Sequence, residues 1–380
     1  MDINFTEEQE MLRKSARDFL AAECPKTKVR ELEDDEKGYS PELWAKMAGL
    51  GWMGLAIPEE YDGMGMTFQD LTVLLEEMGR NVLPGPFGCT VVEGAYFILE
   101  AGSEEQRKEF LPKIANGEAI FTTALLEPGG IYYDAAGIGL KATAQGDKFM
   151  LKGTKVFAEM ANAADYIICV ARTKEGSAPE DGVSLFMVDA KSAGLKSEVI
   201  PTIAFDKQCE VRFDDVEVPK ENLLGELDKG WPVVLKVMQK GVIAKCAESV
   251  GGMQAAVDMT VAFCKERVQY DRPIGAFQAL QHIMSDMWIA TQTSKYLVYQ
   301  VAWMESEGLP CAMEAAMAKA YVNENYKWVT ERTVSLHGGI GTSREHDAGL
   351  YYRRAKAADT AFGDSDYQKE IVAEKMGLIS

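Results

Sequence analysis

Apolar residues recur at helical spacing over roughly the first 115 residues, which predicts an N-terminal part built from helices. The first helix begins with a capping box, because Thr6 is followed three residues later by Gln9. The apolar side chains that then share one face are Leu12, Ala16, Phe19 and Leu20. Further helices are expected over residues 41–50, 67–80, 89–101 and 104–114, with turn-rich segments between them.

From residue 121 onward the period shortens, and short runs rich in β-branched and aromatic residues alternate with Gly and Asp. These runs are FTTALL, FMLKGTKVF, DYIICVART, GVSLFMVDA, LKSEVIPTI and CEVRFDDVEV. A polar turn interrupts ATAQGDKFML, and no helix-length pattern separates the runs. Hairpins and antiparallel pairing are therefore favoured over β-α-β units, which predicts a central β barrel or sandwich.

Helical spacing returns after Trp231 and continues to the end, with one long stretch that reaches Tyr270. Small residues in this stretch would let neighbouring helices approach closely, as in a bundle; they are Gly241, Ala244, Ala247, Gly251, Gly252 and Ala255. The prediction is an α+β chain of three domains. They are an N-terminal α-helical domain over 1–118, a central antiparallel β-barrel or sandwich over 119–226, and a C-terminal helical bundle over 227–380.

Composition and charge narrow the possible partners. Among 380 residues, 59 are acidic and 40 are Lys or Arg, and the net charge of -19 opposes binding to nucleic acid or to an anionic membrane surface. The N-terminus lacks the apolar core of a signal peptide, and no apolar run is long enough to span a bilayer. We therefore expect a cytoplasmic protein with no nucleic-acid partner and no membrane insertion.

Several common chemistries lack their residues. The seven cysteines have no C-x-x-C spacing, which is typical of buried, reduced thiols, and three histidines without H-E-x-x-H give a metal site little to use. Gly339-Ile-Gly341 has no third glycine and no β-α-β unit around it, so a Rossmann site is not supported. There is no Walker A sequence and no G-x-S-x-G elbow, which removes phosphoryl transfer and serine hydrolysis.

An ordered set of motifs over almost the whole chain instead resembles the acyl-CoA dehydrogenase family of flavoenzymes. The two strongest matches are RVQYDRPIGAFQ at 267–278 and LHGGIGTSREHD at 336–347. The others are IPEEYDGMG from Ile57, EEMGR at 76–80, GSEEQ at 102–106, LLEP at 125–128, LKGTKVF at 151–157 and GVSLF at 182–186. Each motif alone is weak, whereas their common order and spacing are specific.

The resemblance implies a fold and a reaction. The fold would be an N-terminal α-helical domain, a central antiparallel β-barrel or sandwich and a C-terminal four-helix bundle, in agreement with the hydrophobic pattern. FAD would lie between the β domain and the C-terminal helices of a homotetramer or homodimer, with a neighbouring subunit completing the site. The reaction would be the α,β-dehydrogenation of an acyl-CoA substrate, with electrons passed to an electron-transfer flavoprotein.

The resemblance also implies which residues bind FAD. Arg267 suits the pyrophosphate as a charge-assisted donor, and Gly338 and Gly339 offer backbone amides without a Cβ. Taken alone, Arg267 is better explained as a solvated charge at a helix end, and the glycines as a helix C-cap after a structural His337. Within the ordered set of motifs, the roles in flavin binding are favoured. Positions that match further family contacts with the flavin are Leu126, Phe157, Ala158, Glu159, Tyr270, Gln278 and Asp364.

The chain departs from the family pattern in the β domain. The usual E-P-x-x-G-S-D run is replaced by Glu127-Pro-Gly-Gly-Ile-Tyr-Tyr-Asp134, in which two tyrosines stand where small residues are usual. Glu159 occupies a position that usually carries a hydroxyl group near the flavin. Contacts to cofactor and CoA are therefore expected to differ in detail.

The largest departure concerns the catalytic base, a carboxylate that must take the α-proton of the thioester. Phe362 occupies the usual base position in the run AFGD, and Gly241 occupies the position that other members use. The remaining candidates, in order, are Glu93, Glu248, Glu159 and Asp364.

Glu93 ranks first because it is a lone acid in a nearly apolar helix that matches the family's acyl-pocket helix, where burial of a charge is costly unless it is paired or functional. An acid favoured by the dipole at a helix N-terminus explains Glu93 equally well. Glu248 ranks second because it lies seven residues after Gly241, on roughly the same helical face.

The relocated acid favours the branch of the family that acts on bulky, branched, dicarboxylic or ring acids such as alicyclic carboxyl-CoA thioesters. Two rival functions stay open. One is a catalytically silent subunit of a hetero-oligomeric acyl-CoA dehydrogenase, which the missing base would explain. The other is a flavin monooxygenase or oxidase on the same scaffold.

Overall fold

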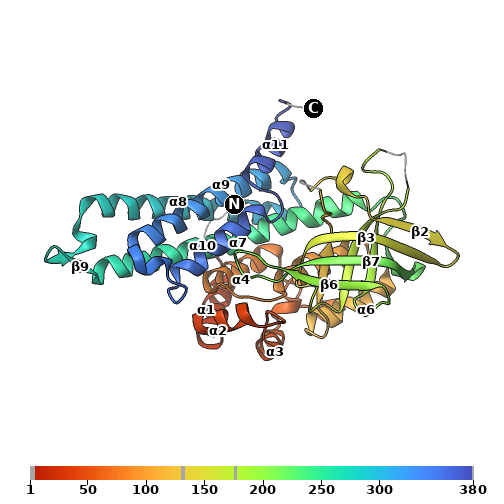
Figure 1. The fold of residues 1–380 in the computed structure, drawn as a ribbon, viewed down its shortest axis with the longest axis horizontal. Helices are drawn as coiled ribbons and strands as arrows, with labels where there is room; N and C mark the ends of the chain where they lie inside the picture. Colours follow the sequence, from red (N-terminus) through yellow and green to blue (C-terminus); the bar gives the residue numbers. More distant parts are fainter. Residues whose placement is uncertain (1–4, 130–132, 175–177, 379–380) are drawn as a thin grey trace. The chain divides into compact units, whose positions relative to one another are not determined.

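A computed structural model describes residues 5–129, 133–174 and 178–378 of the chain (Figure 1). The described chain forms two compact units. The helical unit comprises Met1–Arg30, Thr67–Leu83 and Val242–Ser380, and the sheet unit comprises Glu31–Met66 and Pro84–Gly241. The chain therefore passes between the units several times, and each is described by itself.

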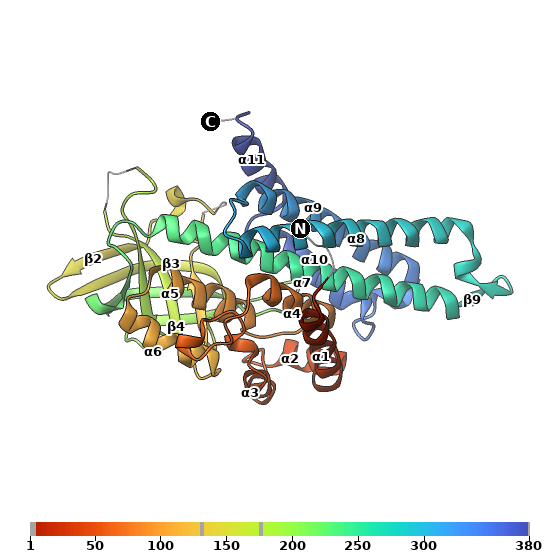
Figure 2. The same cartoon turned by 180° about the vertical axis from the view of Figure 1, so that it is seen from behind.

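The helical unit is built from helices that come from its three chain segments. They are α1 (Glu7–Glu23), α4 (Phe68–Asn81), most of α7 (Trp231–Glu266), α8 (Gln278–Ser306), α9 (Ala312–His337), α10 (Ala348–Thr360) and α11 (Ser365–Lys375). The hairpin of β9 (Val268–Gln269) and β10 (Arg272–Pro273) joins α7 to α8, and the 3-10 turn η7 (Gly338–Thr342) follows α9. Figure 2 shows α7, α8 and α9 running side by side, as a bundle requires.

The sheet unit combines helices with eight strands. Its helices are α3 (Pro41–Gly49), the π-helix η3 (Gly88–Gly94), α5 (Ala95–Ala101) and α6 (Glu104–Ala115), while α2 (Lys26–Asp34) begins in the other unit. The strands are β1 (Phe121–Ala124), β2 (Lys141–Gln145), β3 (Lys148–Glu159), β4 (Tyr166–Arg172), β5 (Val183–Asp189), β6 (Leu195–Ile200), β7 (Gln208–Pro219) and β8 (Leu223–Leu224).

Capping boxes begin three of the helices. The predicted capping box of α1 is confirmed, and two more helices begin in the same way; the pairs are Thr6–Gln9, Thr67–Asp70 and Ser103–Gln106. In each box the hydroxyl accepts from a backbone N–H that has no partner within the helix, so the helix starts at a defined residue.

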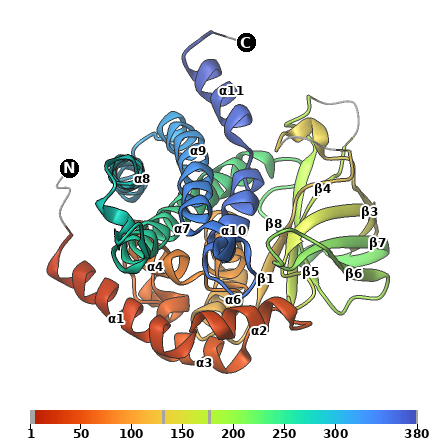
Figure 3. The same ribbon diagram turned by 60° about the vertical axis from the view of Figure 1, so that its left-hand side comes forward.

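The sheet differs from the expected antiparallel barrel because it is mixed and because it is open. Its strand order is β6-β7-β3-β2-β4-β5-β8, with β1 added beside β4 (Figure 3). Most pairs are antiparallel as expected, but β1 and β2 each pair with β4 in parallel, so the sheet is mixed. Within the described ranges its end strands β6 and β8 pair with one neighbour each, so the sheet is open and the barrel prediction is corrected.

The sheet nevertheless curls around a core of its own. The ring of Phe149 on β3 lies 4.9 Å from that of Phe186 on β5, although two strands separate them in the sheet order. The opposite face of β5 carries Leu185 and Met187 into a second core. Phe110 of α6 closes this second core by packing edge-on against Phe121 of β1. Both faces of the central strands are therefore buried.

Two further observations concern the cysteines and the length of the helices. All seven cysteines lie within the described ranges, where they are buried and form no disulfide, as the sequence predicts. None of the helices described in this structure combines the length and the apolar character needed to cross a bilayer.

Glycine allows α4 and α7 to touch through their backbones. A Cβ on Gly79 would lie 1.9 Å from the carbonyl oxygen of Glu248, and a Cβ on Gly251 would lie 1.8 Å from that of Glu76. Neither distance is possible for a real side chain. The expectation that small residues of the long helix allow close approach is therefore confirmed.

We expect Gly251→Ala to lower the midpoint of thermal unfolding of the protein, because overpacking a tight contact costs about 1–3 kcal/mol or more. Gly49 is a matched control, since it ends α3 and no atom of the described chain lies within 4 Å of a Cβ built on it. Gly49→Ala should be neutral or stabilising by about 0.5–1 kcal/mol. Equal midpoints for the two variants would contradict the close crossing.

Candidate functional site

Glu93 lies in a π-helix, a form that the periodicity did not predict. The π-helix η3 covers Gly88–Gly94. Its residues from Cys89 to Val92 and Gly94 are buried, while Glu93 itself is partly exposed. Single π turns inside helices occur frequently at functional sites. The structure therefore presents a carboxylate at the edge of an otherwise apolar surface.

The π-helix is tied to the first strand of the sheet. The hydroxyl of Thr90 donates to the carbonyl oxygen of Phe121 at 3.1 Å and accepts from its N–H at 3.1 Å. Gly94 lies against the same strand, because a Cβ there would be 2.5 Å from the Cβ of Phe121. The segment that carries Glu93 is thus held against β1.

A buried cation lies next to this segment. The Nζ atom of Lys240, at the start of α7, is 4.7 Å from the ring centre of Tyr96, and Lys240 is only 9% exposed. Tyr96 comes three residues after Glu93. The helix α5 that continues from the segment of Glu93 therefore has a buried lysine against it.

A backbone irregularity on β3 exposes Phe157. The pairing of β3 with β7 shifts register between Lys155 and Ala158, and Phe157 takes φ +55° with 54% of its surface exposed. A bulky residue at positive φ is strained, and such strain concentrates at functional sites. The strand thereby presents an aromatic ring to a ligand rather than to the core.

The predicted flavin contacts of the sheet unit come together around Phe157. The N–H of Val156 donates to the carbonyl oxygen of Leu126 at 2.8 Å, which brings the segment after β1 beside β3. Ala158 is buried, and Glu159 pairs with Gln208 in the β3–β7 ladder. Of the two tyrosines in the altered motif, Tyr132 lies outside the described residues, and Tyr133 packs against the core that includes Phe121.

A second group of predicted contacts lies at one end of the helical unit, in and after the β9–β10 hairpin (Figure 2). Arg267 is exposed, and its guanidinium has no partner among the residues that the structure describes. Tyr270 has φ +54° and is 87% exposed, and Gln278 is the exposed first residue of α8. These side chains are available to a ligand.

The glycine pair lies at the same end. The ring of His337 stacks on that of Phe263 at 4.4 Å, one helical turn before Arg267. Gly338 has φ +63°, and no described atom lies within 4 Å of a Cβ built on Gly338 or Gly339. The backbone there is open to an incoming group.

His337 has a buried ring nitrogen without a hydrogen-bond partner among the described residues, a feature that the sequence did not predict. Its Nδ1 lies 2.7 Å from the carbonyl oxygen of Thr333, and burial lowers the pKa of the ring, so the neutral form donates from Nδ1. Its Nε2 is then an acceptor, and it is buried without a partner in the described part of the chain. Such an atom points to a missing donor.

Asp364, which precedes α11, lies near the opposite end of α9 from His337 and the glycine pair. It caps α11 by accepting from the N–H of Tyr367 at 2.9 Å, and the next residue, Ser365, contacts the carbonyl oxygen of Ala320. Ala320 and His337 are 17 residues apart on α9, which is about 25 Å of helix. Asp364 and the glycine pair therefore lie toward opposite ends of α9.

Glu248 is engaged in packing. Its carboxylate lies 2.6 Å from the Nζ of Lys245, and its carbonyl oxygen fills the space beside Gly79 at the crossing with α4.

Phe362, at the usual base position, takes φ +58°, and its carbonyl oxygen accepts a hydrogen bond from the side chain of Gln368 at 2.7 Å.

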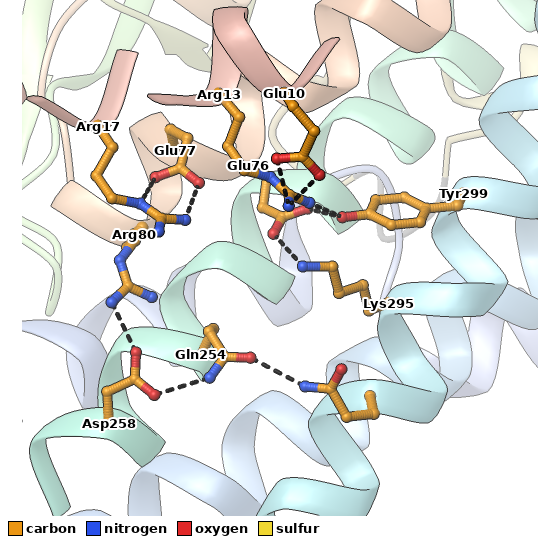
Figure 4. Close-up of polar contacts among 11 residues, drawn as sticks. Glu10, Arg13, Arg17, Glu76, Glu77, Arg80, Gln254, Asp258, Lys295 and Tyr299 are labelled. Atoms are coloured by element: carbon orange, nitrogen blue, oxygen red, sulfur yellow. Dashed lines mark hydrogen bonds and ion pairs between the residues drawn. The ribbon is translucent and has the colours of Figure 1, made fainter. Parts of the chain in front are cut away.

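The EEMGR run takes part in a polar network between helices (Figure 4). Glu76 accepts from Lys295 at 2.7 Å and from the hydroxyl of Tyr299, while Glu77 pairs with Arg17 at 2.6 Å. Burial, followed by the charge of Glu76, raises the pKa of Tyr299, which keeps the hydroxyl a donor. The motif therefore holds helices together.

Comparisons with known proteins agree with these features. Family models match over the length of the chain: "Acyl-CoA dehydrogenase, N-terminal domain" at residues 6–118, "middle domain" at 122–216 and "C-terminal domain" at 228–377. The short-chain specific acyl-CoA dehydrogenase of Clostridium acetobutylicum is 31% identical over 383 residues, covering 99% of this chain and 100% of that protein.

Two further relatives extend the comparison. A caffeyl-CoA reductase–Etf complex subunit of Acetobacterium woodii is 32% identical, covering 97% of this chain and 98% of its own. The structure of butyryl-CoA dehydrogenase from Megasphaera elsdenii superposes with a TM-score of 0.92 at 28% identity, covering 99% of this chain and 100% of that one.

The chain belongs to the acyl-CoA dehydrogenase family. It is accordingly an FAD-dependent oxidoreductase that acts on the CH–CH group of acyl-CoA thioesters. The residues present fit FAD. Within the helical unit, the open Gly338–Gly339 backbone, the buried acceptor of His337 and the available Arg267 offer polar contacts. Within the sheet unit, taken by itself, the exposed Phe157 offers an aromatic ring.

We expect Arg267→Ala to weaken FAD binding roughly tenfold or more, because it removes a charge-assisted donor to an anionic group. Titration of the apoprotein with FAD measures the dissociation constant, and light scattering follows assembly, which should weaken as well. Lys265→Ala is the control, since this exposed cation lies on the last turn of α7. Unchanged FAD affinity in Arg267→Ala would remove Arg267 from the site.

Proposed function

We propose that the chain dehydrogenates an acyl-CoA thioester to the 2,3-enoyl-CoA with Glu93 as the catalytic base. The observation that carries this proposal is the position of Glu93 in a π-helix, at the edge of an apolar surface that is tied to the strand leading to Leu126. A carboxylate in such surroundings suits abstraction of a weakly acidic α-proton.

The reaction divides between the cofactor and the chain. FAD, when bound, accepts the hydride that leaves the β-carbon. Glu93 would take the α-proton onto its carboxylate, and the buried side chains of η3 and α5 would keep water from the cleft. Lys240 would add a positive charge near the site, which favours the ionised form of a nearby acid.

The other acids are less suited to this role. The carboxylate of Glu248 is held by Lys245, and that of Asp364 caps α11. Glu159 lies two residues after the exposed Phe157 on β3. Glu93 is therefore the base that we propose, and Glu248, Glu159 and Asp364 are the acids to test after it.

The substrate class we propose is a bulky, branched, dicarboxylic or ring-bearing acyl-CoA. With Glu93 of η3 as the base, the position of the usual base would be occupied by Phe362, an apolar side chain. The relative named for caffeyl-CoA reduction supports a ring-bearing thioester, and it makes reduction of a 2,3-enoyl-CoA at the same site a second candidate. In that direction Glu93 would return the proton to the α-carbon.

The partner we propose is an electron-transfer flavoprotein, supported by a relative named as part of an Etf complex. The assembly we propose is a homotetramer or homodimer. Asp364 and Gly338 lie toward opposite ends of α9, so one chain would contact two flavins. Exposed Trp288, Ile289 and Tyr296 on α8 offer an apolar surface for another copy.

Two rival functions are distinguished by solution experiments. A catalytically silent subunit would bind FAD, yet no acyl-CoA would reduce it in the purified homo-oligomer. A flavin monooxygenase or oxidase would react rapidly with oxygen once reduced, whereas a dehydrogenase would react slowly. Anaerobic flavin bleaching by a panel of acyl-CoA thioesters tests the proposed function directly.

Glu93→Gln should slow flavin reduction by roughly two orders of magnitude or more, because it keeps the shape of the side chain and removes the proton acceptor. Stopped-flow absorbance measures the reduction rate, and the flavin spectrum should still respond to substrate binding. Glu100→Gln is the control, since this acid follows on α5 and pairs with Lys236 at 3.1 Å.

Near-normal reduction by Glu93→Gln would end its assignment as the base. Slow reduction by Glu248→Gln instead would move the base to α7. Normal rates in both variants would leave Glu159 as the candidate to test.

Phe362→Leu should change substrate preference, because removing part of a pocket wall shifts the relative kcat/KM of two acyl groups by roughly tenfold. The measurement compares flavin reduction by cyclic, branched, dicarboxylic and straight-chain acyl-CoA thioesters. If a folded, FAD-loaded Phe362→Leu were reduced by none of them, Phe362 would do more than line the pocket.

A further inference from the structure

A lysine is completely buried in the sheet unit. Lys155, on β3 opposite Val211 of β7, is 0% exposed. Its Nζ donates to Glu127 Oε1 at 2.7 Å and to the carbonyl oxygen of Leu125 at 2.9 Å. Burial lowers the pKa of Lys155, while the carboxylate of Glu127 opposes that effect. An ammonium group is rarely buried without such partners.

Glu127 connects the lysine to a third segment. The same oxygen, Oε1, accepts from the backbone N–H groups of Gly139 and Leu140, each at 2.9 Å. The residues joined here begin and end the connection between β1 and β2. One carboxylate oxygen therefore fastens both ends of that connection to β3.

The fastened segments carry the predicted flavin wall. Leu126 lies between the two residues that contact Lys155, and its carbonyl oxygen accepts from the N–H of Val156. Phe157 follows directly, at φ +55°. A strained residue keeps its conformation only when its surroundings hold it firmly, and this network supplies that support.

Stability alone does not account for a buried ion pair. Replacing such a pair by uncharged groups of similar volume is often neutral or stabilising, because two charges no longer need to be desolvated. A precise arrangement of the backbone is a better reason to keep one. The network meets the backbone at Leu125, Gly139 and Leu140, which is the arrangement expected of a positioning device.

We propose that Glu127 and Lys155 are positioning residues that hold Leu126 and Phe157 in the geometry that receives the flavin. This inference rests on the proposed flavin contacts of Leu126 and Phe157, and it is independent of which acid is the base. The pair touches no substrate and takes part in no chemical step. Its effect is on how tightly and in what surroundings the flavin is bound.

The test compares Lys155→Met with the double variant Lys155→Met/Glu127→Gln. The double variant contains neither buried charge, and its glutamine oxygen can still accept from Gly139 and Leu140. The control is Lys152→Met, on the same strand, whose exposed side chain pairs with Asp215 at 2.8 Å. Three quantities are measured: the unfolding midpoint of the apoprotein, the dissociation constant for FAD and the visible spectrum of bound flavin.

We expect Lys155→Met to lower the unfolding midpoint and to raise the dissociation constant for FAD tenfold or more. The double variant should recover the midpoint while FAD binding stays weakened and the flavin spectrum stays altered. Lys152→Met should bind FAD within about twofold of the unchanged protein. If Lys155→Met does not fold, the double variant alone decides the question.

The inference is overturned if Lys155→Met binds FAD with unchanged affinity and spectrum. It is also overturned if the double variant regains affinity together with stability, since the pair would then be structural only. Failure of the proposed base leaves this result untouched, because Glu93→Gln is judged by the rate of flavin reduction and these variants by flavin affinity.

Discussion

The burial of two consecutive carboxylates on α4 is the constraint on which the helical unit depends. Glu76 is 4% exposed and Glu77 is 1% exposed, so each needs a partner from another helix. Lys295 and Tyr299 of α8 meet the first, and Arg17 of α1 meets the second (Figure 4). Leaving Glu76 without its partners would cost about 3–5 kcal/mol, whereas Arg17 is half-exposed and its pair with Glu77 contributes less. These charges therefore stabilise the packing of α8, and to a smaller extent of α1, on α4.

The sheet unit applies the same physical chemistry on a smaller scale and closer to the site. The buried charge there is Lys155, and the carboxylate of Glu127 joins it to backbone N–H groups instead of to another helix. In the helical unit the paired charges determine which helices are neighbours. In the sheet unit they determine the path of a connection whose residues are expected to meet the flavin.

Features that depend on residues close in sequence could be predicted, and those that depend on distant partners could not. The capping box at Thr6 and the long helix after Trp231 are local, and both are present. The parallel pairing of β1 with β4 could not be read from alternation, because parallel and antiparallel strands alternate alike. The π-helix around Glu93 has the same apolar residues as an α-helix, so nothing in the pattern distinguishes the two.

The candidate site divides in the same way. Family motifs predicted Phe157 and Gly338 as flavin contacts. The Nε2 of His337, which is unpartnered within the described ranges, could not be predicted, because its burial depends on a fold that stacks the ring against Phe263.

A base at Glu93, as proposed, in place of one at the position of Phe362 would change what controls the geometry of the reaction. The position of Phe362 belongs to the helical unit, while Glu93 and the wall formed by Leu126 and Phe157 belong to the sheet unit. Thr90 ties the π-helix to β1, and β1 leads directly into the segment that Lys155 holds. A base at Glu93 would therefore be held relative to the flavin wall by the hydrogen bonds of Thr90 and of Lys155, which β1 joins within a single unit. Because α-proton removal and hydride transfer act on adjacent carbons, a base at Glu93 would require such local alignment.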